Sequence, residues 1–175
     1  GVNIDEVIAT AESARRAGAR YAMIAPPFYY GIDPDGIYDW YRILSESVDI
    51  GIMVYDQSWR PDLGTTLGLP LIERLAGLHN IVSLKYGSAK LLEAMVVVIE
   101  RFADRFAFVD NSLGFTSALS HMHGGTAYIS GPVTWWPEFE LEFFGLLEQG
   151  KYAEADRHHA RLAPYMSWHH GEFWK

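Results

Sequence analysis

The stretch Ile81-Val82-Ser83-Leu84-Lys85 decides how this chain is interpreted. It is a short hydrophobic run that follows a turn-like segment and ends in an amine. An earlier run, Ile50-Gly51-Ile52-Met53-Val54-Tyr55, has the same form and ends in a phenol. Short continuous apolar runs are typical of buried strands in a parallel sheet. We therefore predict two parallel strands with Tyr55 and Lys85 at their carboxyl ends, the edge where ligands and catalytic groups collect in α/β proteins.

An amine and a phenol at one strand edge are the groups that carbonyl chemistry through a Schiff base requires. An amine attacks a ketone only when it is unprotonated, and burial disfavours its charged form. A tyrosine hydroxyl both donates and accepts hydrogen bonds, so it can move a proton. A strand-end lysine on its own is more often a solvated charge, so Lys85 and Tyr55 have to be weighed with the rest of the chain.

Strand and helix signals alternate along the whole chain. Strands are predicted over residues 21–25, 50–55, 81–85, 106–109 and 126–130. Helices are predicted to begin at Asn3, Asp33 and Ser88, and to cover residues 71–78, 115–122, 137–147 and 151–162. Asn, Asp and Ser are preferred at helix N-caps because their side chains accept hydrogen bonds from free backbone N–H groups. Strands that are each followed by a helix predict a parallel α/β sheet with right-handed crossovers.

Two α/β architectures fit this alternation. An open doubly wound sheet that binds a nucleotide usually carries a glycine-rich phosphate loop, G-x-G-x-x-G or G-x-x-x-x-G-K-[ST], and the sequence contains neither. A (β/α)8 TIM barrel takes eight strands and about 250 residues. Five predicted strands cannot close a barrel, so the barrel interpretation requires this chain to be a fragment of one.

Composition excludes several classes of function. The formal net charge is −8 and no basic stripe is present, so we expect no nucleic-acid partner. No apolar run approaches membrane length, so we expect no membrane span. The absence of cysteine excludes disulfides and is consistent with a cytoplasmic protein. Histidine pairs occur at 121 and 123, 158 and 159, and 169 and 170, but adjacent helical histidines chelate poorly, so we expect no metal site.

Three motifs together resemble a known family. Pro26-Pro27-Phe28-Tyr29-Tyr30 follows the first predicted strand, Tyr55-Asp56-Gln57-Ser58-Trp59-Arg60 follows the second, and Lys85 ends the third. In this order and spacing they resemble the dihydrodipicolinate synthase / N-acetylneuraminate lyase family of class I aldolases. Gly124-Gly125-Thr126-Ala127-Tyr128-Ile129-Ser130 is similar to strand eight of that family. The resemblance covers nearly the whole chain, and it depends on the ordered set rather than on any one motif.

The resemblance implies a fold and a set of residue roles. It implies that residues 1–150 are strands four to eight of a TIM barrel, and that residues 151–175 start a C-terminal helical extension. Lys85 would be the Schiff-base nucleophile and Tyr55 the proton relay. Arg60 would help to hold the site or a substrate carboxylate, and Tyr29 would be a loop tyrosine that in some members enters the neighbouring subunit's site. The backbone carbonyl of Ile129 would line the pocket. No cofactor is implied.

The resemblance also implies a lyase that acts on a pyruvate-like 2-keto acid, with an aldehyde or sugar acid as the other substrate, in a homodimer or homotetramer. Aldol chemistry and the dehydration of a keto-deoxy sugar acid share the same lysine and tyrosine, so both stay open. The sequence departs from the family pattern at Asp56, Trp59, Tyr86 and 110–112, which are near the mouth of the site and leave the substrate open. A non-catalytic homologue or fragment, or an unrelated open-sheet binding module, would also fit the sequence. The fragment alone is expected to be inactive.

Overall fold

The structure is a computed structural model, and it describes residues 3–27, 31–57, 67–87, 92–168 and 171. Its strands form one parallel sheet with the order β1-β2-β3-β4-β5. The strands are β1 (Tyr21–Ile24), β2 (Gly51–Tyr55), β3 (Ile81–Tyr86), β4 (Ala107–Asp110) and β5 (Ala127–Tyr128). Each strand pairs with the next one along the chain. This order is that of a barrel, whereas a doubly wound sheet reverses direction at a switch point, so the interpretation as an open sheet is wrong.

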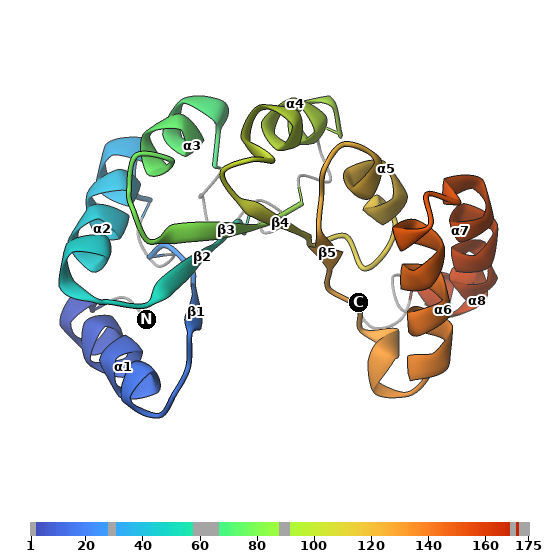
Figure 1. Cartoon of the computed structure of the whole chain (residues 1–175), viewed down its shortest axis with the longest axis horizontal. Coiled ribbons are helices and arrows are strands. Elements are labelled where there is room, and N and C mark those ends of the chain that lie inside the picture. Colours follow the sequence, from blue (N-terminus) through green and yellow to red (C-terminus); the bar gives the residue numbers. More distant parts are fainter. Residues whose placement is uncertain (1–2, 28–30, 58–66, 88–91, 169–170, 172–175) are drawn as a thin grey trace.

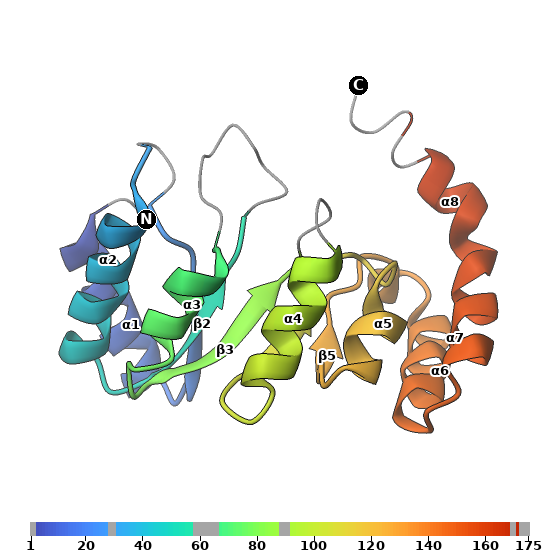
Figure 2. The same cartoon turned by 90° about the horizontal axis from the view of Figure 1, so that it is seen from above.

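The helices lie outside the curve of the sheet. They are α1 (Ile4–Arg16), α2 (Pro34–Ser47), α3 (Leu69–Leu75), α4 (Leu92–Phe102), α5 (Ser117–Met122), α6 (Pro137–Glu148), α7 (Tyr152–His159) and α8 (Ala163–Trp168). The strands follow an arc, with α1 to α5 along its convex side (Figure 1). The last three helices are grouped beyond β5, at the opposite end of the sheet from α1 (Figure 2). The predicted parallel α/β architecture is therefore confirmed.

Local sequence explains where the first helices begin and end. The side-chain oxygen of Asn3 accepts a hydrogen bond from the N–H of Asp5 at 2.9 Å, which caps α1. Asp33 accepts one from the N–H of Gly36 at 2.8 Å, and Pro34 fits the first turn of α2 because it has no N–H to leave unpaired. The predicted start at Ser88 lies outside the described residues.

The C-terminal helix prediction was wrong in one respect. A single helix was expected over 151–162, but α7 ends at His159, a 3-10 turn covers 160–162, and α8 follows. Pro164 stands in the first turn of α8. It has no N–H for an i→i−4 bond and its ring crowds the preceding turn, so a helix is expected to be interrupted before it.

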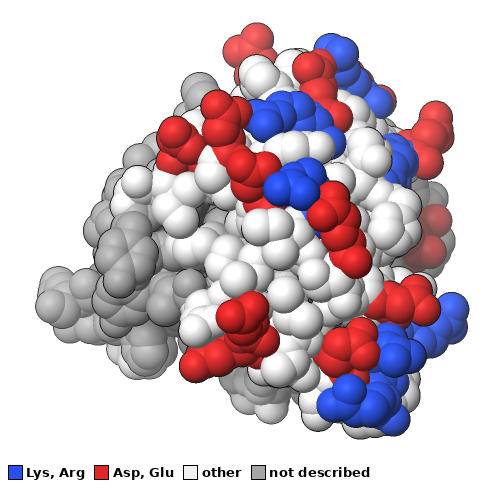
Figure 3. All heavy atoms as spheres, turned by 90° about the vertical axis from the view of Figure 1, so that its left-hand side faces the viewer, with Lys and Arg blue, Asp and Glu red and all other residues white. Residues whose placement is uncertain are grey.

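The two faces of the sheet differ in their surroundings. On the convex face Ile52, Val54 and Leu84 are fully buried beneath the helices. On the concave face Tyr21 and Met23 of β1 are 59% and 55% exposed. Successive residues of a strand face opposite sides of a sheet, so the alternation in β1 and β2 identifies the concave side chains. Helix surfaces carry interspersed acidic and basic groups (Figure 3).

Two polar side chains hold the amino ends of the central strands. Asn80 donates from its carboxamide to the carbonyls of Val48 and Ile50 at 2.9 and 3.2 Å. The guanidinium of Arg105 donates to three carbonyls of the segment before and at the start of β3, those of Ala76, Leu78 and Ile81, at 3.0, 2.6 and 2.7 Å. These bonds satisfy backbone groups that have no partner in the sheet, and they fix where β2 and β3 begin.

Candidate active site

Tyr55 and Lys85 are direct neighbours at the carboxyl ends of β2 and β3. They are register partners in the parallel pair. The Nζ atom of Lys85 lies 3.9 Å from the centroid of the Tyr55 ring, and Lys85 is only 8% exposed. The pairing continues one step further, because the N–H of Asp56 donates to the Lys85 carbonyl at 2.9 Å. The side-by-side arrangement expected from the sequence is present.

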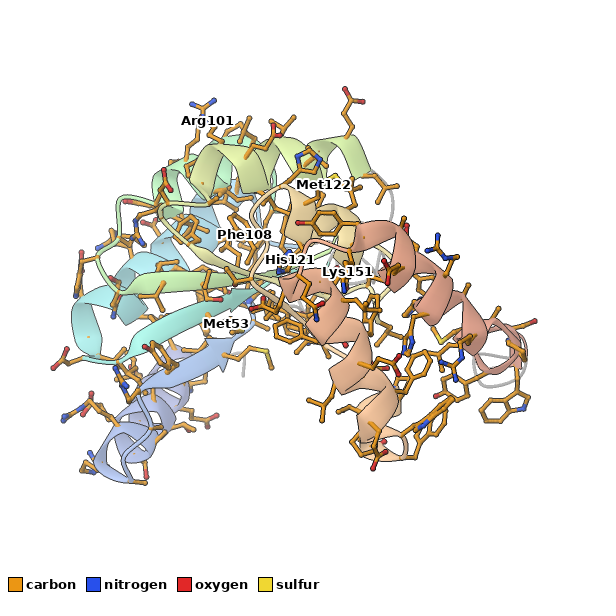
Figure 4. The ribbon with its side chains drawn as sticks, turned by 45° about the vertical axis from the view of Figure 1, so that its right-hand side comes forward. Met53, Arg101, Phe108, His121, Met122 and Lys151 are labelled. Atoms are coloured by element: carbon orange, nitrogen blue, oxygen red, sulfur yellow. The ribbon has the colours of Figure 1, made fainter. Side chains whose placement is uncertain are left out.

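The register places this pair on the concave face. Tyr55 and Met53 share the side of β2 opposite the buried Val54, and their register partners are Lys85 and Ser83. Figure 4 shows Met53 on one side of the sheet and Phe108 on the other, beneath the helices. The Ser83 hydroxyl donates to the carbonyl of Ala107 at 2.7 Å. The amine and the phenol therefore share the inner side of the sheet, close to its carboxyl edge.

A buried layer of phenols lies behind the pair. The hydroxyl of Tyr41, on α2, donates to the carbonyl of Ile24 at 2.7 Å, and Tyr41 is fully buried. Burial raises the pKa of Tyr41 well above its usual value. Burial, and then the charge of Asp56, raise the pKa of Tyr86 to about 12. Both phenols stay neutral at ordinary pH. They can support the strand ends from behind, but they supply no proton-transfer group on the concave side.

A network of hydrogen bonds around the Asp110 carboxylate fixes the turn that follows β4. Asp110 is 1% exposed, and its carboxylate accepts the Ser112 N–H at 3.0 Å and the Ser112 hydroxyl at 2.7 Å. It also accepts the Thr116 hydroxyl at 3.1 Å and the Ser117 hydroxyl at 2.6 Å. These charge-assisted bonds compensate for the burial of the carboxylate. They also hold the turn between β4 and α5 in one shape.

From the sequence, residues 110–112 were interpreted only as a departure from a family pattern, and the hydrogen-bond network around Asp110 was not predicted. A signal was present, since Asp followed by Ser at the second position and by Thr and Ser further on is the spacing of a side-chain-capped turn. The hydroxyl partners became evident only in the structure.

The remaining predicted site residues are Ile129, Tyr29 and Arg60. Ile129 is 39% exposed, and its N–H donates to the Asp110 carbonyl at 2.8 Å, which places it just beyond β5 at the edge where Lys85 lies. Tyr29 and Arg60 lie outside the described residues.

The histidines in the part of the chain that the structure describes contact separate partners. His121 and His123 contact the separate carboxylates of Glu148 and Glu100 at 3.1 and 2.7 Å, and His158 donates to the Phe139 carbonyl at 3.0 Å. Residues 169 and 170 are not described. In the part of the chain that the structure describes, no three His, Cys, Asp or Glu side chains gather as a metal site would require. No helix of that part is both long and apolar enough to cross a membrane.

The sheet order and the lysine–tyrosine pair at the carboxyl edge define a protein of the (β/α)8-barrel class, with its candidate site where that fold places its active sites. The chain belongs to the dihydrodipicolinate synthetase family, whose model matches residues 1–173. The family expected from the motifs is thereby confirmed.

Curated relatives agree with this assignment. The chain is 29% identical over 159 residues to a 4-hydroxy-tetrahydrodipicolinate synthase of Archaeoglobus fulgidus, covering 91% of this chain and 54% of the relative. It is 28% identical over 163 residues to the enzyme of that name from a Psychrobacter species, covering 93% and 52%. An uncharacterized DapA-like lyase of Thermococcus kodakarensis is 26% identical over 170 residues, covering 92% and 55%. The chain spans about half the length of the curated relatives that it matches.

Solved structures support the barrel fold. A dihydrodipicolinate synthase from Aquifex aeolicus has a TM-score of 0.87 at 18% identity, covering 98% of this chain and 58% of the other. An Acinetobacter baumannii dihydrodipicolinate synthase complexed with pyruvate gives 0.86 at 20%, covering 97% and 57%. A Clostridium difficile protein in complex with mannosamine gives 0.84 at 18%, covering 95% and 56%. At these identities the likeness establishes the fold alone, and it confirms the prediction of part of a TIM barrel.

Proposed function

We propose that the protein is a lyase that acts on a pyruvate-like 2-keto acid through a Schiff base on Lys85. The observation that carries this proposal is the Lys85 amine, 8% exposed and 3.9 Å from the Tyr55 ring centroid, at the carboxyl edge of a barrel sheet. An amine beside a phenol supplies the nucleophile and the proton-transfer group that Schiff-base chemistry requires. Family membership agrees with a lyase.

The chemistry follows from the two groups. The unprotonated amine of Lys85 attacks the keto carbon, and loss of the carbonyl oxygen as water leaves a protonated imine. That cation withdraws electrons, so the neighbouring carbon can lose a proton or a carbon–carbon bond can break. In the synthetic direction the resulting enamine attacks an aldehyde, and water then releases the product from the lysine. Tyr55 serves as the proton relay, because its hydroxyl both accepts and donates.

Several further roles belong to the same proposal. Arg60 would hold a carboxylate, Tyr29 would reach the site from its loop, and the carbonyl of Ile129 would line the pocket. Residues 1–150 would contribute βα units of the barrel, and 151–175 would start a helical extension. The protein would act as a cytoplasmic homo-oligomer. A dehydratase would use the same lysine and tyrosine, and it would be distinguished by release of water from a sugar-derived acid without a second carbonyl product.

The test is chemical trapping on the protein as the cell makes it. Pyruvate followed by borohydride should leave an irreversible adduct, and peptide mass mapping should place it on Lys85. Lys85→Arg should abolish trapping and turnover, because a guanidinium has no usable nucleophile at neutral pH. Lys151→Arg is the matched control, since Lys151 is exposed beside α7. Tyr55→Phe should still trap, with turnover slowed by roughly 10²–10⁴.

Two results would contradict the proposal. If a folded protein gives no adduct with any of a panel of keto acids, a non-catalytic homologue is the better description. If the adduct maps to Lys90, the strand that supplies the amine has been assigned incorrectly.

A further inference from the structure

Asp56 is a buried carboxylate directly behind the lysine–tyrosine pair. It follows Tyr55 in the chain, and its N–H donates to the carbonyl of Lys85 at 2.9 Å. Asp56 is 2% exposed and continues the buried side of β2 that carries Val54. Its side chain therefore lies on the convex side of the sheet, whereas the amine lies on the concave side of the same strand ends, between Tyr55 and the apolar Val109 in register.

The charge of Asp56 already acts on two neighbouring groups. Tyr41 of α2 is fully buried and Tyr86 of β3 is 5% exposed. Burial is the largest cause of the raised pKa of both phenols, and the charge of Asp56 adds to it in each case. Both phenols stay neutral at ordinary pH, so the charge in this layer is that of Asp56. A charge in such weakly hydrated surroundings is poorly screened and reaches beyond its direct contacts.

Among the described residues, the other buried carboxylates are those of Asp110 and Glu140. Asp110 is the register partner of Tyr86, and four hydrogen-bond donors hold its carboxylate and disperse its charge. Glu140 of α6 accepts the Tyr128 hydroxyl at 2.6 Å, beside the last strand of the sheet. The buried side chains of α3 are apolar. Asp56 is therefore the buried carboxylate whose own backbone is hydrogen-bonded to that of the lysine.

A negative charge behind the amine matters because Schiff-base chemistry passes through a cation. The protonated imine carries its positive charge on the lysine nitrogen, and the electron withdrawal that breaks the neighbouring bond depends on that proton. A carboxylate on the other side of the sheet stabilises the cation without contacting the substrate, because an opposite charge nearby favours the charged form of a group.

We propose that Asp56 is a positioning residue that acts on Lys85 electrostatically, and that its carboxylate favours the protonated nitrogen in the free lysine and in the imine. The inference deepens the proposed Schiff-base function and rests on it. Side chains on opposite faces of neighbouring strand ends place the two charges roughly 9 Å apart. At an effective dielectric constant of about 20, a unit charge at that distance moves a proton equilibrium by about one pH unit.

The experiment measures the protonation of Lys85 directly, in the protein as the cell makes it and without pyruvate. A trace of acetic anhydride acetylates unprotonated amines, and peptide mass mapping gives the extent of acetylation at each lysine as a function of pH. Asp56→Asn keeps the shape of the side chain and removes its charge. The pH of half-maximal acetylation at Lys85 should fall by about one unit in this variant, and that of the exposed Lys151 should not move.

Three further variants separate charge from packing. Asp56→Glu keeps the charge, so it should keep the pH of half-maximal acetylation at Lys85. Asp56→Ser removes the charge with a smaller side chain, so it should lower that pH as Asp56→Asn does, and it serves if the amide does not fold. Glu140→Gln is the matched control, because it neutralises a buried carboxylate on α6 and should leave Lys85 unchanged. Borohydride trapping of pyruvate on Lys85 in each variant shows that the site is folded.

The outcomes distinguish this inference from the function on which it rests. If Asp56→Asn and Glu140→Gln give the same pH of half-maximal acetylation at Lys85, the electrostatic role of Asp56 is overturned while the Schiff base stands. If Asp56→Glu lowers that pH as far as Asp56→Asn does, packing is the cause and the inference is again overturned. Failure to trap pyruvate in the unsubstituted protein would overturn the proposed function, and the role of Asp56 toward the imine with it.

Discussion

Removal of the Asp110 carboxylate should destabilise the protein strongly. Hydrogen bonds to a charged group contribute about 1.5–3 kcal/mol each, and part of this is offset by the burial of the charge. Thr116 and Ser112 can regain water because they are only partly buried, but Ser117 is 2% exposed and its hydroxyl would be left without a partner. Asp110→Ala should therefore cost about 3 kcal/mol of unfolding free energy. Asp110→Asn, which keeps one carbonyl oxygen, should cost about 1–2 kcal/mol.

Urea unfolding followed by fluorescence measures this effect. With an m-value of about 2 kcal/mol/M, a loss of 3 kcal/mol lowers the midpoint by about 1.5 M at unchanged slope. Asp104→Ala is the matched control: Asp104 is exposed in the turn before β4, and its removal should change stability by less than about 0.5 kcal/mol. If Asp110→Ala and Asp104→Ala shift the urea midpoint equally, the hydrogen-bond network around Asp110 contributes nothing to stability and the prediction is refuted.

Two further predictions concern backbone strain and pH. Gly114 has φ +97°, and a Cβ added there would overlap the His159 ring, so Gly114→Ala should lower the free energy of unfolding by about 3 kcal/mol. Gly150 has φ +68° with open space around it, so Gly150→Ala should lower it by only about 1 kcal/mol. Thermal unfolding of the two variants measures the difference. Equal costs would show that the His159 contact is unimportant. Burial and Asp56 raise the pKa of Tyr86 to about 12, so the folded state holds this proton more tightly than the unfolded state. The resulting stabilisation of the folded state is complete below pH 10 and is lost as the pH rises from about 10 through 12. Tyr86→Phe should therefore reduce the fall in unfolding free energy over this range by up to about 3 kcal/mol. If unfolding free energy depends on pH in the same way in the variant, the raised pKa of Tyr86 is contradicted.

Much of the architecture was predictable because its signals are local. Apolar runs ending at Tyr55 and Lys85 predicted buried parallel strands, and Asn3 and Asp33 marked helix starts that the structure confirms. The single helix predicted over 151–162 was wrong in its last turn, because Pro164 has no N–H for an i→i−4 hydrogen bond and a 3-10 turn covers 160–162. The strand predicted over 126–130 is observed only as β5, because the register with β4 covers only Ala127 and Tyr128.

The sequence by itself determined the order of βα units and the residue types at the strand ends, because hydrophobic period and capping depend on neighbours in the chain. Only the tertiary structure decided the register that brings the Lys85 amine to 3.9 Å from the Tyr55 ring centroid. It also decided which hydroxyls satisfy Asp110 and that Oε1 of Gln57 is buried without a donor among the described residues. Those features depend on contacts between segments far apart in the chain, which are fixed by packing of the helices on the sheet rather than by local preference.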